Sequence, residues 1–147
     1  MDRSSEKIPH RLAEIIEDFQ WAEGREKVEL LLQYSQILPP LPVQLANNKD
    51  AMDQVQECMT PVFVQTEKSD GGIVFHFDVP ESSPTVRGFA SILKQGLDGL
   101  SPEEVLAVPN DFFQEMGLDG VLSYQRLNGI AAILAHMKRL SLEEIGK

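Results

Sequence analysis

One cysteine, Cys58, stands in the stretch VQECMTPVFV, where a polar segment meets a run of β-branched and aromatic residues. A cysteine reacts as its thiolate, and a nearby cation favours that form. Arg126, in the stretch SYQRLNGI, is a candidate for such a cation. Free cysteines are more often small buried hydrophobes, and arginines on helix turns are more often solvated cations. The position of Cys58 between a loop and a strand nevertheless suits a reactive group.

The histidines His10, His76 and His136 have no spacing typical of metal ligands, so we expect them on the surface or on a strand face. His76 could still meet Cys58 in space and act as the base of a cysteine hydrolase. The sequence has no recognisable signature for the oxyanion hole that such an enzyme needs. A single cysteine also excludes C-x-x-C chemistry and multi-cysteine metal ligation within one chain. We therefore expect no metal and no bound cofactor.

The composition is that of one globular domain spanning residues 1–147, with 42% hydrophobic and 24% charged residues. Acidic residues outnumber basic ones 23 to 13, and the net charge of -10 argues against a nucleic-acid partner. No apolar run approaches the ~20 residues that cross a bilayer, and the N-terminus lacks the apolar core of a secretory signal. We expect no membrane partner and, with a free thiol that fits a reducing compartment, a cytoplasmic location.

Apolar residues at helical spacing predict an amphipathic helix over residues 8–19 and a second from near Gly24 to Leu38, where two prolines follow. The second helix is expected to bury Val28, Leu31, Leu32 and Ser35. Trp21, between the two helices, is expected to anchor the core under the turn. Residues 39–53 then have the composition of an extended loop.

The segments VFVQTE and IVFHFDV, joined by KSDGG, predict a β-hairpin. Its second strand should bury one face, made of Ile73, Phe75, Phe77 and Val79.

Four further helices are expected. The first has Ser83 as its cap and Pro84 as its first residue and runs to Leu97, and a short second one opens with the capping box SPEE. The third covers NDFFQEMG with Asn110 as its cap, and the fourth follows Ser123. The pair Glu143 and Glu144 is expected at a solvated helix end. This order of elements predicts an α+β fold with helices packed on one side of a small antiparallel sheet.

The chain resembles the SufE family of sulfur acceptors in five segments and in their order. These segments are FQWAEGREKVELLLQYSQILPPLP, VQECMTPVFV, GGIVFHF, TVRGFASIL and SYQRLNGIAAIL. The resemblance covers about residues 8–140. It implies a SufE/NifU-like fold in which Cys58 is the sulfur-accepting thiol and Arg126 is its thiolate or persulfide partner. It departs from the family at Glu57, where a glycine is usual, and at PESSP, where Ser82 or Ser83 replaces an acidic residue.

The resemblance further implies a carrier that takes persulfide sulfur from a SufS-like, PLP-dependent cysteine desulfurase and stimulates that enzyme. The sulfur then passes to a SufBCD-like scaffold for iron-sulfur cluster assembly. Such a protein is an accessory transpersulfidation partner rather than a stand-alone enzyme. Two alternatives stay open: a docking module in which Cys58 is incidental, and a hydrolase that uses Cys58 with His76.

Overall fold

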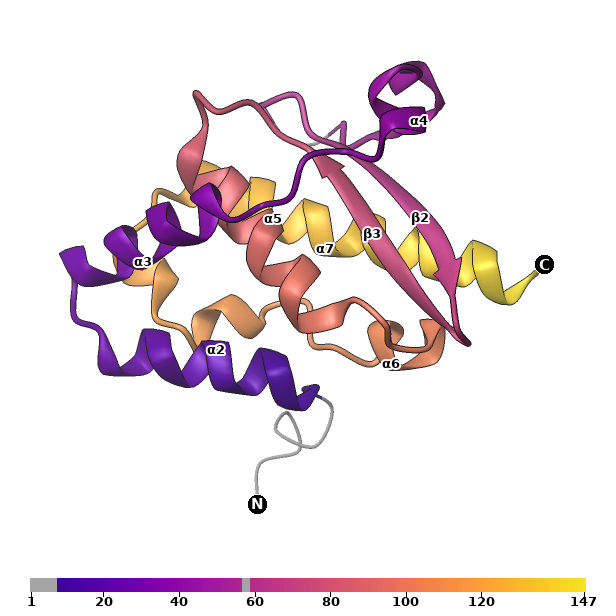
Figure 1. Cartoon of the computed structure of the whole chain (residues 1–147). Helices are drawn as coiled ribbons and strands as arrows, with labels where there is room; N and C mark the ends of the chain where they lie inside the picture. The colour runs from indigo at the N-terminus through magenta and orange to yellow at the C-terminus, as the bar shows by residue number, and fades with distance from the viewer. Residues whose placement is uncertain (1–7, 57–58) are drawn as a thin grey trace.

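The computed structural model describes residues 8–56 and 59–147. This part of the chain forms six helices, three strands and three short 3-10 turns (Figure 1). The helices are α2 (His10–Trp21), α3 (Arg25–Gln36), α4 (Val43–Ala46), α5 (Pro84–Leu97), α6 (Pro102–Leu106) and α7 (Tyr124–Ile145). The strands are β1 (Asp53–Gln54), β2 (Phe63–Ser69) and β3 (Gly72–Asp78).

The sheet is antiparallel with strand order β1-β2-β3. Its hairpin turn consists of two residues, Asp70 and Gly71, with φ angles of 47° and 83°. Positive φ at both central positions is the geometry of a type I′ turn, which Asp-Gly favours because its twist matches that of the strands. The strands therefore continue to Ser69 and Gly72, further into the KSDGG segment than the sequence predicted.

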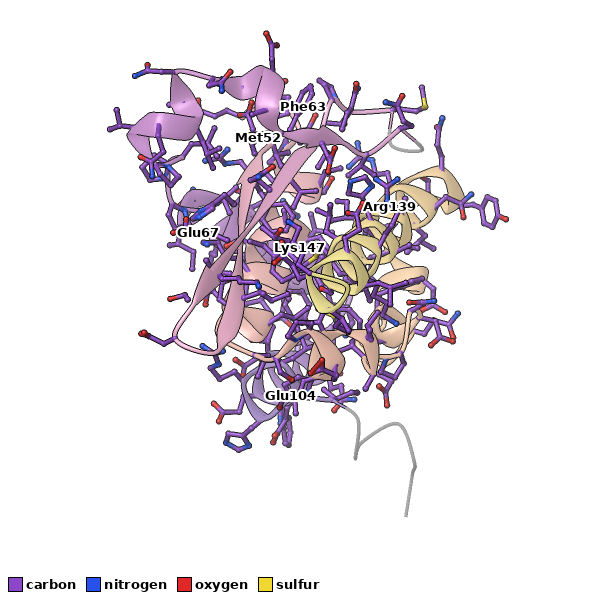
Figure 2. The ribbon with its side chains drawn as sticks, turned by 90° about the vertical axis from the view of Figure 1, so that its right-hand side faces the viewer. Met52, Phe63, Glu67, Glu104, Arg139 and Lys147 are labelled. Atoms are coloured by element: carbon purple, nitrogen blue, oxygen red, sulfur yellow. The ribbon has the colours of Figure 1, made fainter. Side chains whose placement is uncertain are left out.

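The helices cover one face of this sheet, and the predicted α+β class is confirmed. Ile73, Phe75 and Phe77 of β3 are buried, while the alternate residues are partly exposed. β3 packs on α5 and β2 packs on α7. Figure 2 shows the two long strands beside α7, with Lys147 labelled near the C-terminal end of this helix.

The free edge of β3 is occupied by groups from the C-terminal end of α5. Asp98 accepts a hydrogen bond from the Phe75 backbone amide at 2.8 Å, and Lys94 donates to the Phe75 carbonyl at 2.6 Å. Ile73 exchanges backbone hydrogen bonds with Leu100 and Gly99 at 2.8 Å each. An edge strand with satisfied backbone groups is a poor template for pairing with another chain, and here its pairing also fixes the position of α5.

Helix α5 lies at the centre of the fold, with α3, α2, α7 and β3 packed around it. It approaches α3 so closely that a Cβ on Gly88 would lie 2.1 Å from the Leu31 carbonyl oxygen. Arg87 donates to the carbonyls of Ser35 at 3.0 Å and Val79 at 2.7 Å. The N-terminal half of α5 is thus tied to both α3 and the end of β3.

The prediction that Trp21 anchors the core is wrong, because this side chain is 81% exposed. The buried stripe of α2 is Leu12, Ile15, Ile16 and Phe19. Trp21 lies two residues after Phe19, about 200° further around a helix, and therefore points away from that stripe. Phe19 is the anchor at this turn, and its ring stacks on Tyr34 with centroids 6.1 Å apart.

Other expectations also change. Leu32 is 36% exposed, because Leu31 and Ser35 form the buried side of α3. Residues 39–53 contain α4, a 3-10 turn and the start of β1 rather than only extended loop. The NDFFQEMG segment forms a 3-10 turn preceded by Asp111, not a helix capped by Asn110.

Two side chains expected in solvent are largely covered. His136 is 8% exposed, since its position on α7 falls among buried residues of that helix. The Glu144 side chain is 9% exposed and lies 3.1 Å from Lys147 and 3.8 Å from Lys68 of β2. Glu143 is exposed, as expected, whereas Glu144 fastens the end of α7 to the hairpin.

Replacing Gly88 by alanine tests the close crossing of α3 and α5. The added methyl meets backbone rather than a side chain that can move, so Gly88→Ala should lower the free energy of unfolding by about 3 kcal/mol or more. Gly120→Ala is the matched control, because nothing lies within 4 Å of a Cβ at that position. Urea unfolding followed by circular dichroism measures both variants, and equal stabilities would contradict the packing described.

Candidate functional site

Arg126 lies in the first turn of α7, as predicted from the sequence. Ser123 is the N-cap of this helix, and its hydroxyl accepts a hydrogen bond from the Arg126 backbone amide at 3.3 Å. The cap satisfies one of the amides that a helix start leaves without an intrahelical partner. The backbone of Arg126 is therefore fixed, and its side chain is free to reach a neighbouring element.

The guanidinium of Arg126 reaches the first turn of α5. Its Nη1 donates to the hydroxyl of Thr85 at 2.7 Å, and Thr85 is only 8% exposed. Among the described residues Arg126 has no carboxylate partner. In a chain with a net charge of -10, an arginine without a counter-ion is available to an anion.

Cys58 and its neighbour Glu57 lie outside the described residues. The two residues that follow Cys58 are described, and both contact the helix starts. The amide of Gln125 on α7 contacts the sulfur of Met59. The Thr60 hydroxyl lies 3.1 Å from the hydroxyl of Ser83 at the start of α5. The segment directly after the cysteine is therefore held against the same two helix starts that position Arg126.

Ser83 is the N-cap residue of α5, as predicted, with Pro84 in the first turn. Its hydroxyl caps no amide of the helix and instead pairs with Thr60. The side chain thus joins the helix to the segment after Cys58.

A hollow of about 250 Å³ lies between these elements. Among the described residues, the lining combines polar and apolar side chains and contains no acidic one: Met59, Thr60, Ser82, Ser83, Pro84, Thr85, Val86, Gln125, Arg126 and Gly129. The starts of two helices carry partial positive charge, and the guanidinium adds a full one. The described lining of the hollow is therefore electropositive although the chain as a whole is acidic.

Sequence reasoning found Arg126 and Ser83 but missed the roles of Thr85 and Thr60. Thr85 precedes Phe89 by one helical turn, on the buried stripe of α5. A polar side chain on such a stripe needs a hydrogen-bond partner, and this was a usable signal. The pairing of Thr60 with Ser83 joins residues far apart in the chain, and no spacing in the sequence indicates it.

His76 lies on β3, where its Nε2 is 3.0 Å from a carboxylate oxygen of Glu67. It borders a different hollow, together with Lys94 and residues 39–42. A contact between His76 and Cys58 stays a prediction, since Cys58 is outside the described residues. No group of three or more His, Cys, Asp or Glu side chains in the described ranges is arranged to hold a metal ion.

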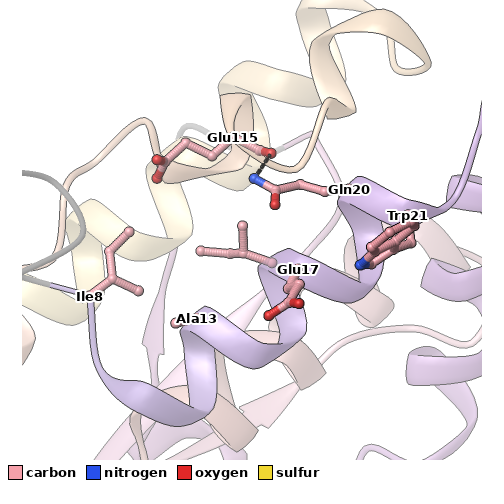
Figure 3. A pocket seen from close by; sticks show the side chains of 7 residues that line it. Ile8, Ala13, Glu17, Gln20, Trp21 and Glu115 are labelled. Atoms are coloured by element: carbon pink, nitrogen blue, oxygen red, sulfur yellow. Dashed lines mark hydrogen bonds between the residues drawn. The ribbon is translucent and has the colours of Figure 1, made fainter. Parts of the chain in front are cut away.

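A larger hollow, about 540 Å³, lies along α2 beside the exposed ring of Trp21 (Figure 3). Glu17 and Glu115 border it, and the Gln20 amide donates to the Glu115 carbonyl at 3.0 Å. Within the described ranges, no cysteine, histidine or cation lines it. Its described lining therefore offers neither a nucleophile nor an anion site.

Two described groups have clearly shifted pKa values, and neither lines the hollow at Arg126. Burial, with a smaller contribution from Asp18, raises the pKa of Tyr34. Burial lowers the pKa of Lys138, which donates to the carbonyl of Val108. Both groups fasten helices to neighbouring segments, so we assign them no chemistry.

Comparison with known proteins identifies the family of this chain. The family model described as SufE, an Fe-S metabolism associated domain, matches residues 13–141. An uncharacterized SufE-like protein of Mycobacterium tuberculosis is 45% identical over 133 residues, which are 90% of this chain and 92% of that protein. The cysteine desulfuration protein SufE of Plasmodium vivax is 29% identical over 105 residues, 70% of this chain and 40% of that protein.

A solution structure of a hypothetical protein from Thermus thermophilus has the same fold. It superposes with a TM-score of 0.83 at 32% identity, and the match covers 95% of this chain and 99% of the other. In the described part of the chain, no helix is both long enough and apolar enough to span a bilayer.

The Ser123 cap is testable because it fixes the turn that carries Arg126. Ser123→Ala should lower the free energy of unfolding by about 1 kcal/mol, since one helix-start amide loses its acceptor. Ser123→Asn should retain wild-type stability, because asparagine is an equally good cap. Urea titration distinguishes the two, and an alanine variant as stable as the asparagine variant would contradict the capping role.

Proposed function

The chain belongs to the SufE family, and we propose that it accepts sulfur from a cysteine desulfurase on Cys58 and passes it on for iron-sulfur cluster assembly. The main observation in support of this proposal is the electropositive hollow at Arg126, against which Met59 and Thr60 are held. A thiolate and a persulfide are both anions, and a cation with no carboxylate partner stabilises either.

The proposed reaction is a thiol exchange. The Cys58 thiolate attacks the outer sulfur of a persulfide on the desulfurase. A bond forms between that sulfur and the sulfur of Cys58, the sulfur-sulfur bond of the desulfurase breaks, and the cysteine of the desulfurase leaves as a thiolate. No external oxidant or reductant is needed, because one persulfide replaces another. Pyridoxal phosphate stays with the desulfurase, which releases the sulfur from L-cysteine.

A single cysteine suits this role. A second thiol nearby would attack the persulfide, form an internal disulfide and release sulfide. With Cys58 alone, the sulfur stays bound until another protein removes it. Removal of the product also explains how such a carrier stimulates its desulfurase. We propose a SufS-like desulfurase as donor, a SufBCD-like scaffold as recipient and the reducing cytoplasm as the compartment.

The lone cysteine gives a direct test by intact-mass spectrometry without reductant. After incubation with a cysteine desulfurase, pyridoxal phosphate and L-cysteine, the wild type should gain sulfur and Cys58→Ser should gain none. Desulfurase turnover should rise with the wild type only. Binding to the desulfurase with no sulfur on the wild type, and equal activation by Cys58→Ser, would instead support a docking module.

Removing the cation tests the role of the hollow. Arg126→Gln should raise the pKa of the Cys58 thiol and slow sulfur transfer at neutral pH roughly three- to tenfold, because fewer molecules carry the thiolate. Arg25→Gln is the matched control, since Arg25 is an exposed arginine of α3 whose Nε lies 3.9 Å from Glu29. Rates come from timed mass spectra. Equal slowing by both variants would assign the effect to the net charge of the chain rather than to the hollow.

A further inference from the structure

We propose that Thr85 is a positioning residue, which holds the Arg126 guanidinium at the hollow so that its charge acts on the sulfur of Cys58. This inference rests on the proposed function and adds a residue that does not itself touch the reacting sulfur. It starts from the hydrogen bond of 2.7 Å between Arg126 Nη1 and the Thr85 hydroxyl.

The arginine needs such a partner. Arg126 lies in the first turn of α7, where the helix dipole disfavours a cation. Its long side chain has many rotamers, and it forms no ion pair with any described residue. Within the described ranges, Thr85 is its one side-chain hydrogen-bond partner. Without that bond the guanidinium would move into solvent, where a charge has little effect on a distant group.

Thr85 is a rigid anchor. Its side chain is β-branched, which restricts its rotamers, and it is 8% exposed. It belongs to the first turn of α5, which is fixed by the bonds of Arg87 to Ser35 and Val79. The hydroxyl therefore stays in one place relative to the two helix starts. A fixed acceptor restricts the guanidinium to the wall of the hollow.

The chemistry of the acceptor matters as much as its position. A carboxylate at this place would bind the guanidinium more tightly and also neutralise it, leaving little attraction for a thiolate. A neutral hydroxyl accepts one hydrogen bond and leaves the net charge and the remaining N–H donors of the guanidinium available. Thr85 thus orients the cation without competing with the anion that the proposed function requires.

The test measures the pH dependence of Cys58 alkylation by iodoacetamide in the free protein. Thr85→Val keeps the shape of the side chain and removes the hydroxyl, so the midpoint of the profile should rise by about 0.5. Alkylation below the midpoint should slow about threefold. Thr85→Ser should restore the wild-type profile, because it restores the acceptor.

Thr66→Val is the matched control, since it removes a threonine hydroxyl that lies 3.5 Å from Glu144 at the other end of α7. Its profile should equal that of the wild type. Should Thr85→Val fail to fold, as judged by circular dichroism, Thr85→Ala replaces it.

Each outcome of this test either supports or overturns the proposed role of Thr85. The role of Thr85 is overturned when Thr85→Val and Thr85→Ala both keep the wild-type profile while Arg126→Gln raises the midpoint. That result leaves the proposed function in place. A raised midpoint in Thr85→Ser equal to that of Thr85→Val assigns the effect to packing and also overturns it. No shift in any variant, Arg126→Gln included, removes both residues from the chemistry of the thiol. Sulfur uptake by the wild type still reports separately on Cys58.

Discussion

The packing around α5 is the constraint on which the rest of the structure depends. Ten of its residues are buried, and α3, α2, α7 and β3 all pack against it. Two glycines make this possible: Gly88 admits the backbone of α3, and Gly96 admits Leu12 of α2. Polar groups near its C-terminal end, Lys94 and Asp98, occupy the edge of β3. A helix held on so many sides cannot shift its N-terminal turn independently.

The position of the hollow follows from that rigidity. The strand β3 ends near the start of α5, and Arg87 of α5 donates to the carbonyl of Val79, the residue that follows β3. The start of α7 lies against the start of α5 through Arg126 and Thr85. The packing of α5 therefore places the positive ends of two helices and the guanidinium of Arg126 close together. Thr60 and Met59 bring the chain just after Cys58 to the same point.

Local signals in the sequence were sufficient for the elements that build this site. Three short-range rules are confirmed: Pro84 follows Ser83 at the start of α5, a capping box opens α6 at Ser101, and an apolar stripe after Ser123 marks α7. The hairpin is also confirmed, and its turn lies at Asp70 and Gly71 within the predicted KSDGG segment. Trp21 was misplaced because its size suggested burial, whereas the helical period of α2 decided its direction. The short β1 and the bond between Thr60 and Ser83 depend on tertiary contacts that no local pattern encodes. The pairing of Cys58 with Arg126 stays a prediction.

Thiol chemistry bears on the proposed role of Arg126 and on Glu57, which directly precedes Cys58 in the sequence. A thiol with a very low pKa is fully ionised but is a weak nucleophile, and one with a high pKa is rarely ionised. Attack is fastest when the pKa lies near the ambient pH. Under the proposed function Arg126 lowers the pKa of the thiol, and we expect the carboxylate of Glu57, next to Cys58 in the sequence, to oppose that effect. Under the proposed function, these opposed charges would keep the pKa of the thiol between the two limits, as a carrier that must both accept and release sulfur requires.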